Sequence, residues 1–82
     1  MNTQTPPKHR KTKGVISLLA KHGLDENEIR WRETYSGRWM FSRTSPLAFV
    51  VPIHPDDEAG KVLLRRGFEV DNMGRDYVYY LR

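Results

Sequence analysis

The chain has 82 residues, no cysteine and a formal net charge of +4. This length allows one domain with a small core, and the lack of cysteine excludes disulfides and thiolate metal sites. No apolar run approaches the ~20 residues of a transmembrane helix, and no apolar segment follows the basic N-terminal residues as in a secretory signal. We therefore expect a cytoplasmic protein without a membrane partner.

The positive charge is concentrated in residues 1–13, MNTQTPPKHRKTK. This segment carries four basic side chains and no acidic one, and the other basic and acidic side chains of the chain cancel. It has no apolar residue after Met1, so it buries too little surface to offset the entropy of ordering. The sequence predicts a disordered basic tail over residues 1–13 and a folded domain over residues 14–82. The side chains of the tail that would attract nucleic acid are Lys8, Arg10, Lys11 and Lys13.

Residues 14–24, GVISLLAKHGL, have the pattern of a short amphipathic helix. The side chains with the i, i+3, i+4, i+7 spacing of one helical face are Val15, Leu18, Leu19 and His22. Gly23 fits the left-handed residue that follows a helix, and Leu24 fits the apolar contact after it. We expect the helix to end at this glycine.

Residues 27–43, NEIRWRETYSGRWMFSR, interleave arginines with large aromatic residues. A three-residue loop ending at Gly37 predicts a β-hairpin in which Trp31 pairs with Phe41. This register gathers the aromatic rings on one face and leaves three arginines on the other, namely Arg30, Arg32 and Arg38. A two-residue loop would instead place Phe41 among the arginines, because a one-residue slip exchanges the faces of a strand. We favour the first register, which buries Trp31.

The second half of the chain predicts a strand, a helix and a hairpin. Residues 46–53, PLAFVVPI, form an apolar run typical of a buried strand, and residues 54–66 place three acids at the start of a helix and two arginines in its last turn. Residues 68–82 predict a hairpin with Gly74 in the same loop position as Gly37. The order is α-β-β-β-α-β-β, a small single α+β domain with two helices packed on one face of an antiparallel sheet. Duplication of an αββ unit, or shared capping and turn chemistry, would explain the likeness of the two halves.

No residue pattern indicates catalysis, a metal or a cofactor. The histidine of HPDDE precedes three acids, but a helix start explains these acids and consecutive side chains point in different directions. The order α-β-β-β-α over residues 14–66 resembles the double-stranded-RNA-binding domain and small toxin ribonucleases. The first resemblance implies lysines at the start of the second helix, where residues 56–58 are acidic, and the second implies a strand histidine where Trp39 and Tyr77 stand. We assign no family and expect a protein that is not an enzyme.

Two functional hypotheses fit the basic and aromatic residues. The first is an accessory module that binds RNA or DNA through the tail and the arginine-bearing strand face. Tyr77 and Tyr79 alternate along the last strand and would stack on unpaired bases if they were exposed. The alternative is a regulator or inhibitor of the phage or mobile-element type that acts on a host protein complex, since arginine and tyrosine are also frequent in protein hot spots. A ribonuclease-like toxin is a third hypothesis. The arginines would also be explained without any function if they only form the solvated outer face of a strand.

Overall fold

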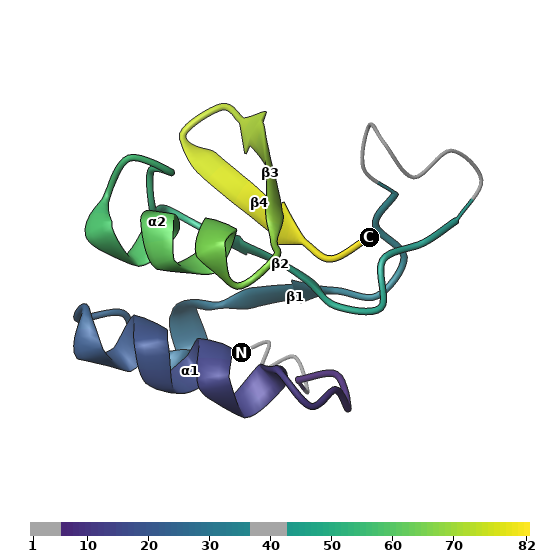
Figure 1. The fold of residues 1–82 in the computed structure, drawn as a ribbon, viewed down its shortest axis with the longest axis horizontal. Helices are drawn as coiled ribbons and strands as arrows, with labels where there is room; N and C mark the ends of the chain where they lie inside the picture. The colour runs from purple at the N-terminus through teal and green to yellow at the C-terminus, as the bar shows by residue number, and fades with distance from the viewer. Residues whose placement is uncertain (1–5, 37–42) are drawn as a thin grey trace.

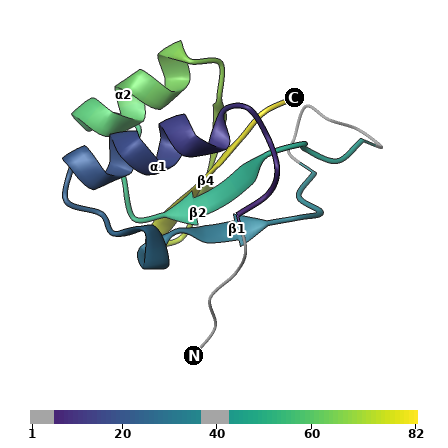
Figure 2. The same cartoon turned by 90° about the horizontal axis from the view of Figure 1, so that it is seen from below.

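The computed structural model describes residues 6–36 and 43–82. The elements in chain order are α1 (Thr12–Lys21), the short 3-10 helix η1 (Glu26–Glu28), β1 (Arg30–Arg32), β2 (Ala48–Val51), α2 (Glu58–Arg65), β3 (Glu69–Met73) and β4 (Asp76–Tyr80) (Figure 1). The strands form one antiparallel sheet in the order β1-β2-β4-β3. Both helices cover the same face of this sheet (Figure 2). The predicted α+β class is confirmed, and the strand expected over residues 38–42 lies outside the described residues.

Both helices end in the motif that their glycines predict. At the end of α1 the Leu24 amide donates to the Leu19 carbonyl oxygen at 2.9 Å, and Gly23 has a φ of +86°. Gly67 and Phe68 repeat this arrangement at the end of α2, where Gly67 has a φ of +101°. Glycine adopts such a φ at no steric cost. The closures turn Leu24 and Phe68 inward, and both side chains are buried.

The core lies between the helices and the sheet and is built around Phe49. The ring centroid of Phe49 lies 5.6 Å from that of Trp31, 5.5 Å from that of Phe68 and 5.8 Å from that of Tyr79. The helices cover these rings with Val15, Leu18, Leu19, Ala59 and Leu63. The prediction that Trp31 is a core residue is confirmed, because its side chain is buried among these residues. Phe41, its predicted cross-strand partner, lies outside the described residues.

A second, smaller apolar cluster lies on the face of the sheet opposite the helices. Alternation along β2 and β4 directs a second set of side chains to this face, namely Ala48, Val50, Val78 and Tyr80. A bend at residues 33–34 brings Tyr35 onto the cluster, where its ring centroid is 5.1 Å from that of Tyr80. The Tyr35 hydroxyl donates to a carboxylate oxygen of Asp71 on β3. The sheet is therefore apolar on both sides at its centre.

The folded part begins before residue 14. Thr12 starts α1 and is buried, and its Oγ1 donates to the Pro7 carbonyl oxygen at 2.8 Å. The Lys11 amide donates to Nδ1 of His9 at 3.1 Å. These side-chain hydrogen bonds close a turn ahead of the helix, which composition alone does not indicate. Of the predicted tail, residues 6–13 are therefore part of the described fold.

The β3–β4 hairpin has a shorter loop than predicted. Met73 pairs with Asp76, so the loop consists of Gly74 and Arg75. The prediction placed Gly74 last in a three-residue loop. Instead Oδ1 of Asn72 accepts a hydrogen bond from the Gly74 amide at 2.8 Å, and Gly74 has a φ of +78°. The register predicted at Gly37 lies outside the described residues.

Candidate nucleic-acid interface

The two helices run antiparallel, which brings the start of α1 against the end of α2 (Figure 1). Nζ of Lys11 donates to the backbone carbonyl oxygen of Arg66 at 2.6 Å. In return, Nη1 of Arg66 donates to the Gly14 carbonyl oxygen at 3.3 Å. Arg66 is the residue that caps α2, so Lys11 satisfies a carbonyl group that the helix leaves without an internal partner. Two basic segments far apart in the sequence are thereby joined.

This junction gathers six basic residues at one end of the helical layer. We call this group the basic end; its members are Lys8, Arg10, Lys11, Lys13, Arg65 and Arg66. All of them are exposed except Lys11, which is half-buried. The first acidic residue of the sequence is Asp25, which follows α1. The fold therefore adds the arginines of α2 to the basic residues of the N-terminal segment.

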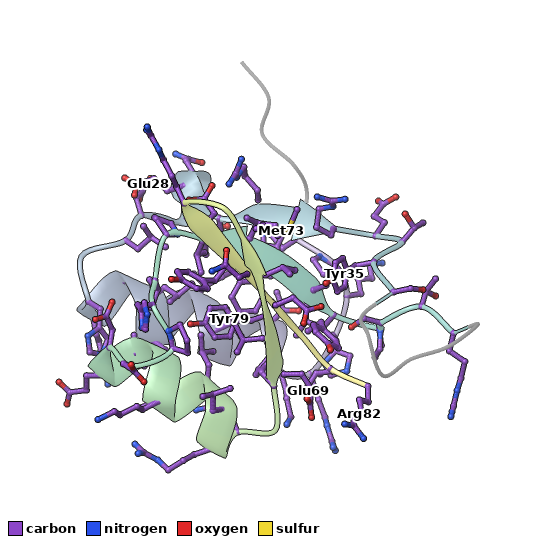
Figure 3. All side chains as sticks on the ribbon, turned by 90° about the horizontal axis from the view of Figure 1, so that it is seen from above. Glu28, Tyr35, Glu69, Met73, Tyr79 and Arg82 are labelled. Carbon is purple, nitrogen blue, oxygen red and sulfur yellow. The ribbon has the colours of Figure 1, made fainter. Side chains whose placement is uncertain are left out.

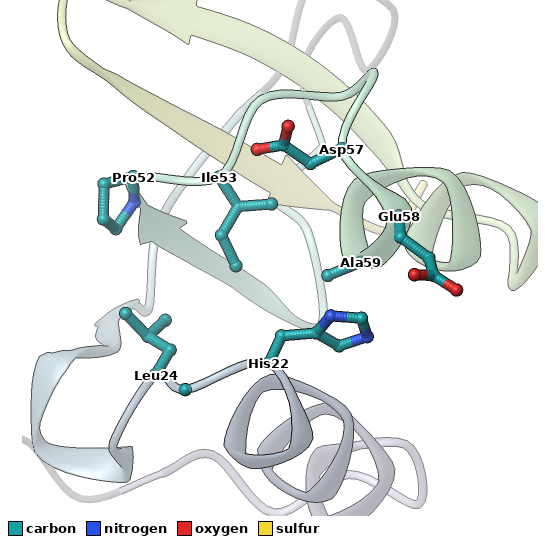
Figure 4. Close-up of a pocket in the computed structure, with 8 residues that line it drawn as sticks. His22, Leu24, Pro52, Ile53, Asp57, Glu58 and Ala59 are labelled. Carbon is teal, nitrogen blue, oxygen red and sulfur yellow. The ribbon is translucent and has the colours of Figure 1, made fainter.

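The opposite end of the helical layer is acidic. A cavity of about 350 Å³ opens there between the end of α1 and the start of α2, and His22, Asp57 and Glu58 line it (Figure 4). These acids suit the positive N-terminal end of α2. Nδ1 of His54 accepts a hydrogen bond from the Asp56 amide at 2.9 Å, so this histidine stabilises the turn before the helix. Among residues 6–36 and 43–82, no group of three or more histidine, aspartate or glutamate side chains could hold a metal ion.

The arginines of β1 lie among acidic partners. Arg30 and Arg32 are exposed on either side of the buried Trp31, as predicted. Arg30 forms an ion pair with Asp76 at the start of β4. This face also carries Glu69, which pairs with Arg82 at 3.3 Å (Figure 3). Asp71 lies on the same face, because it is the cross-strand partner of Val78. The strand face is therefore mixed in charge rather than a basic stripe, and Arg38 lies outside the described residues.

The tyrosines of β4 do not form an exposed stacking surface. Tyr79 is fully buried, and its hydroxyl donates to the Ile53 carbonyl oxygen at 2.7 Å. Burial, followed by the negative charge of Asp57, raises the pKa of Tyr79 above its ordinary value. Tyr77 is half-buried, with its ring centroid 5.2 Å from that of His54. Tyr79 therefore does not meet the condition of exposure on which its predicted contact with bases depended, because β4 lies between β2 and β3 and beneath the helices.

Sequence reasoning missed the contribution of Arg65 and Arg66 to the basic surface. Their position in the last turn of a helix is sufficiently explained by the negative C-terminal end of that helix. The signal available in the sequence was the absence of acidic residues before Asp25. An antiparallel helix pair would then have placed both arginines beside that acid-free segment.

Comparison of the chain with family models, with curated proteins and with solved structures finds no match. Within the part of the chain that the structure describes, none of the helices is both long and apolar enough to cross a membrane.

Proposed function

We propose that this protein is a non-enzymatic module that binds the phosphate backbone of RNA or DNA through its basic end. The observation that carries the proposal is the Lys11–Arg66 junction, which holds cations from two distant segments together. Each lysine or arginine that contacts a phosphate releases condensed counterions, and this release supplies most of the affinity of sequence-independent binding. We place this activity in the cytoplasm.

The strand face is a weaker candidate for phosphate contact. The guanidinium group of Arg30 already has a carboxylate partner in Asp76. Asp71 and Glu69 on the neighbouring part of this face would repel a phosphate backbone. The basic end has no such interspersed acids in its N-terminal segment.

The salt dependence of binding tests this function. With a generic duplex DNA, engagement of the whole basic end predicts a loss of affinity of about a thousandfold between roughly 50 and 200 mM salt. The affinity is measured by fluorescence anisotropy across that range. Absence of binding at the low-salt end, or an affinity that does not respond to salt, rejects the proposal.

A protein partner is the second candidate, and the face of the sheet opposite the helices favours it. Met73 is 45% exposed on this face. Its cross-strand partner is Asp76, which pairs with Arg30. Methionine and arginine are enriched in protein interfaces. If the protein is a regulator of this kind, it should capture one discrete protein from a bacterial lysate that has been treated with nuclease. Mass spectrometry identifies the captured protein. A Met73→Asp variant should lose that protein, and retention by the variant removes this surface from consideration.

A further inference from the structure

The cavity between the end of α1 and the start of α2 has an apolar side and a charged side (Figure 4). On the apolar side Pro52 is exposed and Ile53 is half-buried, so both offer surface to an incoming group. On the charged side lie Asp57 and Glu58, which are both exposed. The cavity therefore suits a side chain with an apolar stem and a cationic head, which is the structure of lysine and arginine.

Further acidic residues surround this cavity. The chain leaves α1 through η1, which packs against α1 and carries acids at both of its ends. We call the whole group the acidic end; its members are Asp25, Glu26, Glu28, Asp56, Asp57 and Glu58. All six are exposed, and Lys21 and Lys61 on the adjoining helix turns offset only part of their charge. The helical layer thus has six basic residues at one end and six acidic residues at the other.

We propose that this cavity binds the basic end of a second copy of the protein. A lysine or arginine of that copy places its stem on Pro52 and Ile53 and its cationic group beside Asp57 and Glu58. The surfaces that meet are different, so the contact is heterologous and repeats from copy to copy instead of closing into a dimer. The inference goes beyond the proposed function and does not depend on it.

The charges of the protein itself identify the occupant. Because the two ends lie at opposite ends of the helical layer (Figure 1), copies arranged in line bring the basic end of one against the acidic end of the next. Complementary charge steers two surfaces together and sets their orientation. Exposed ion pairs are individually weak and are screened by salt. The association is therefore weak, and it requires high protein concentration and low ionic strength.

Neutralising the acidic end tests the inference. The acidic-end variant carries Glu26→Gln, Glu28→Gln and Glu58→Gln, which changes the net charge from +4 to +7. Asp57 is left unchanged, because its Oδ2 accepts a hydrogen bond from the His54 amide at 3.1 Å. Thermal melting establishes that this variant is folded.

Two further variants separate the contact from a general effect of charge. The control variant carries Glu33→Gln, Thr34→Lys and Thr44→Lys, which are exposed positions outside both ends and give the same net charge of +7. The basic-end variant removes three cations from the other partner of the contact; its substitutions are Arg10→Gln, Lys13→Gln and Arg65→Gln. All three of these residues are exposed.

The weight-average mass is measured by sedimentation equilibrium at rising protein concentration, without nucleic acid. At low salt, wild type and the control variant should exceed the monomer mass of 9.6 kDa and rise past the mass of a dimer. High salt should return both to the monomer. The acidic-end and basic-end variants should remain monomeric. A monomeric wild type at low salt, a plateau at the dimer, or association that survives the loss of charge at either end overturns the inference.

Discussion

Lys11 and Arg66 are 55 residues apart in the sequence, yet Nζ of Lys11 donates a 2.6 Å hydrogen bond to the Arg66 backbone carbonyl oxygen. The Arg66 side chain returns a hydrogen bond to Gly14 on α1. These two contacts fix the end of α2 to the start of α1. They also keep two cations close together at the surface, although like charges repel. A bound anion would relieve that repulsion.

Replacing the ammonium group of this contact should lower stability. Lys11→Met keeps the length and the packing of the side chain but removes the hydrogen bond to Arg66. We expect a loss of about 1 kcal/mol in the free energy of unfolding, measured by urea denaturation. Lys13→Met is the control, because Lys13 is exposed in the first turn of the same helix. Equal stability of the two variants would show that the contact contributes nothing to the fold.

Truncation of Trp31 should nearly unfold the protein. Its ring packs against Phe49 in the core, and the loss of a buried aromatic side chain costs about 3–5 kcal/mol. That cost is comparable with the whole stability of a small domain. The neighbouring Arg32→Ala should change stability by no more than about 0.5 kcal/mol, because Arg32 is exposed. A Trp31→Ala protein with the melting temperature of wild type would contradict the position of this ring in the core.

The same substitution should have opposite effects at two helical glycines. At Gly60 a Cβ atom would lie 2.4 Å from the His54 carbonyl oxygen and 2.8 Å from the Pro55 Cα, so the backbone must move. We expect Gly60→Ala to lower the free energy of unfolding by about 1–3 kcal/mol. This loss exceeds the ~1 kcal/mol by which alanine stabilises a helix relative to glycine. Gly14→Ala meets only a flexible arginine side chain and should be neutral or stabilising. Chemical denaturation of both variants checks this, and an equal response at the two sites would refute the close approach at Gly60.

Two tyrosines should ionise at a higher pH than ordinary phenols. Burial, followed by the hydrogen bond to Asp71, raises the pKa of Tyr35, and burial likewise raises that of Tyr79. Above the ordinary value of about 10, the folded state therefore binds more protons than the unfolded state, and stability falls as the pH rises through this range. Phenolate absorbance should show a late phase at high pH that is smaller in a Tyr35→Phe, Tyr79→Phe double variant. A late phase that is unchanged in this variant would contradict both assignments.

Local patterns predicted the fold class and the ends of the helices. The apolar spacing of α1 and the glycines at positions 23 and 67 act over a few residues, and the structure has both helix closures as expected. The burial of Trp31 followed from gathering apolar rings on one face of a strand. These features need no knowledge of how distant segments meet.

Features that depend on tertiary contacts could not be predicted. Strand alternation separates Tyr79 from Tyr80, but it does not show that the sheet is covered on both faces at β4. The ion pair of Arg30 with Asp76 joins residues 46 positions apart. The basic end depends on the antiparallel packing of the helices, so an interpretation of the sequence that placed the basic surface in the tail missed two of its six basic residues, Arg65 and Arg66.

The measurement that tests the basic end most directly compares two triple charge reversals of equal charge. One variant carries Arg10→Glu, Lys13→Glu and Arg65→Glu. The other carries Arg32→Glu, Arg43→Glu and Arg75→Glu, and all three of these arginines are exposed and lie outside the basic end. Each reversal removes two units of charge, so both variants change from +4 to −2. Net charge therefore cannot distinguish them.

Nucleic-acid affinity is measured as a function of salt for wild type and both variants. If the basic end contacts phosphates, its variant should bind more weakly, and its salt slope should fall by about 3, one unit for each lost contact. The slope of the second variant should stay close to that of wild type. Equal losses in the two variants, or a larger loss in the second, would contradict the assignment of the interface to the basic end.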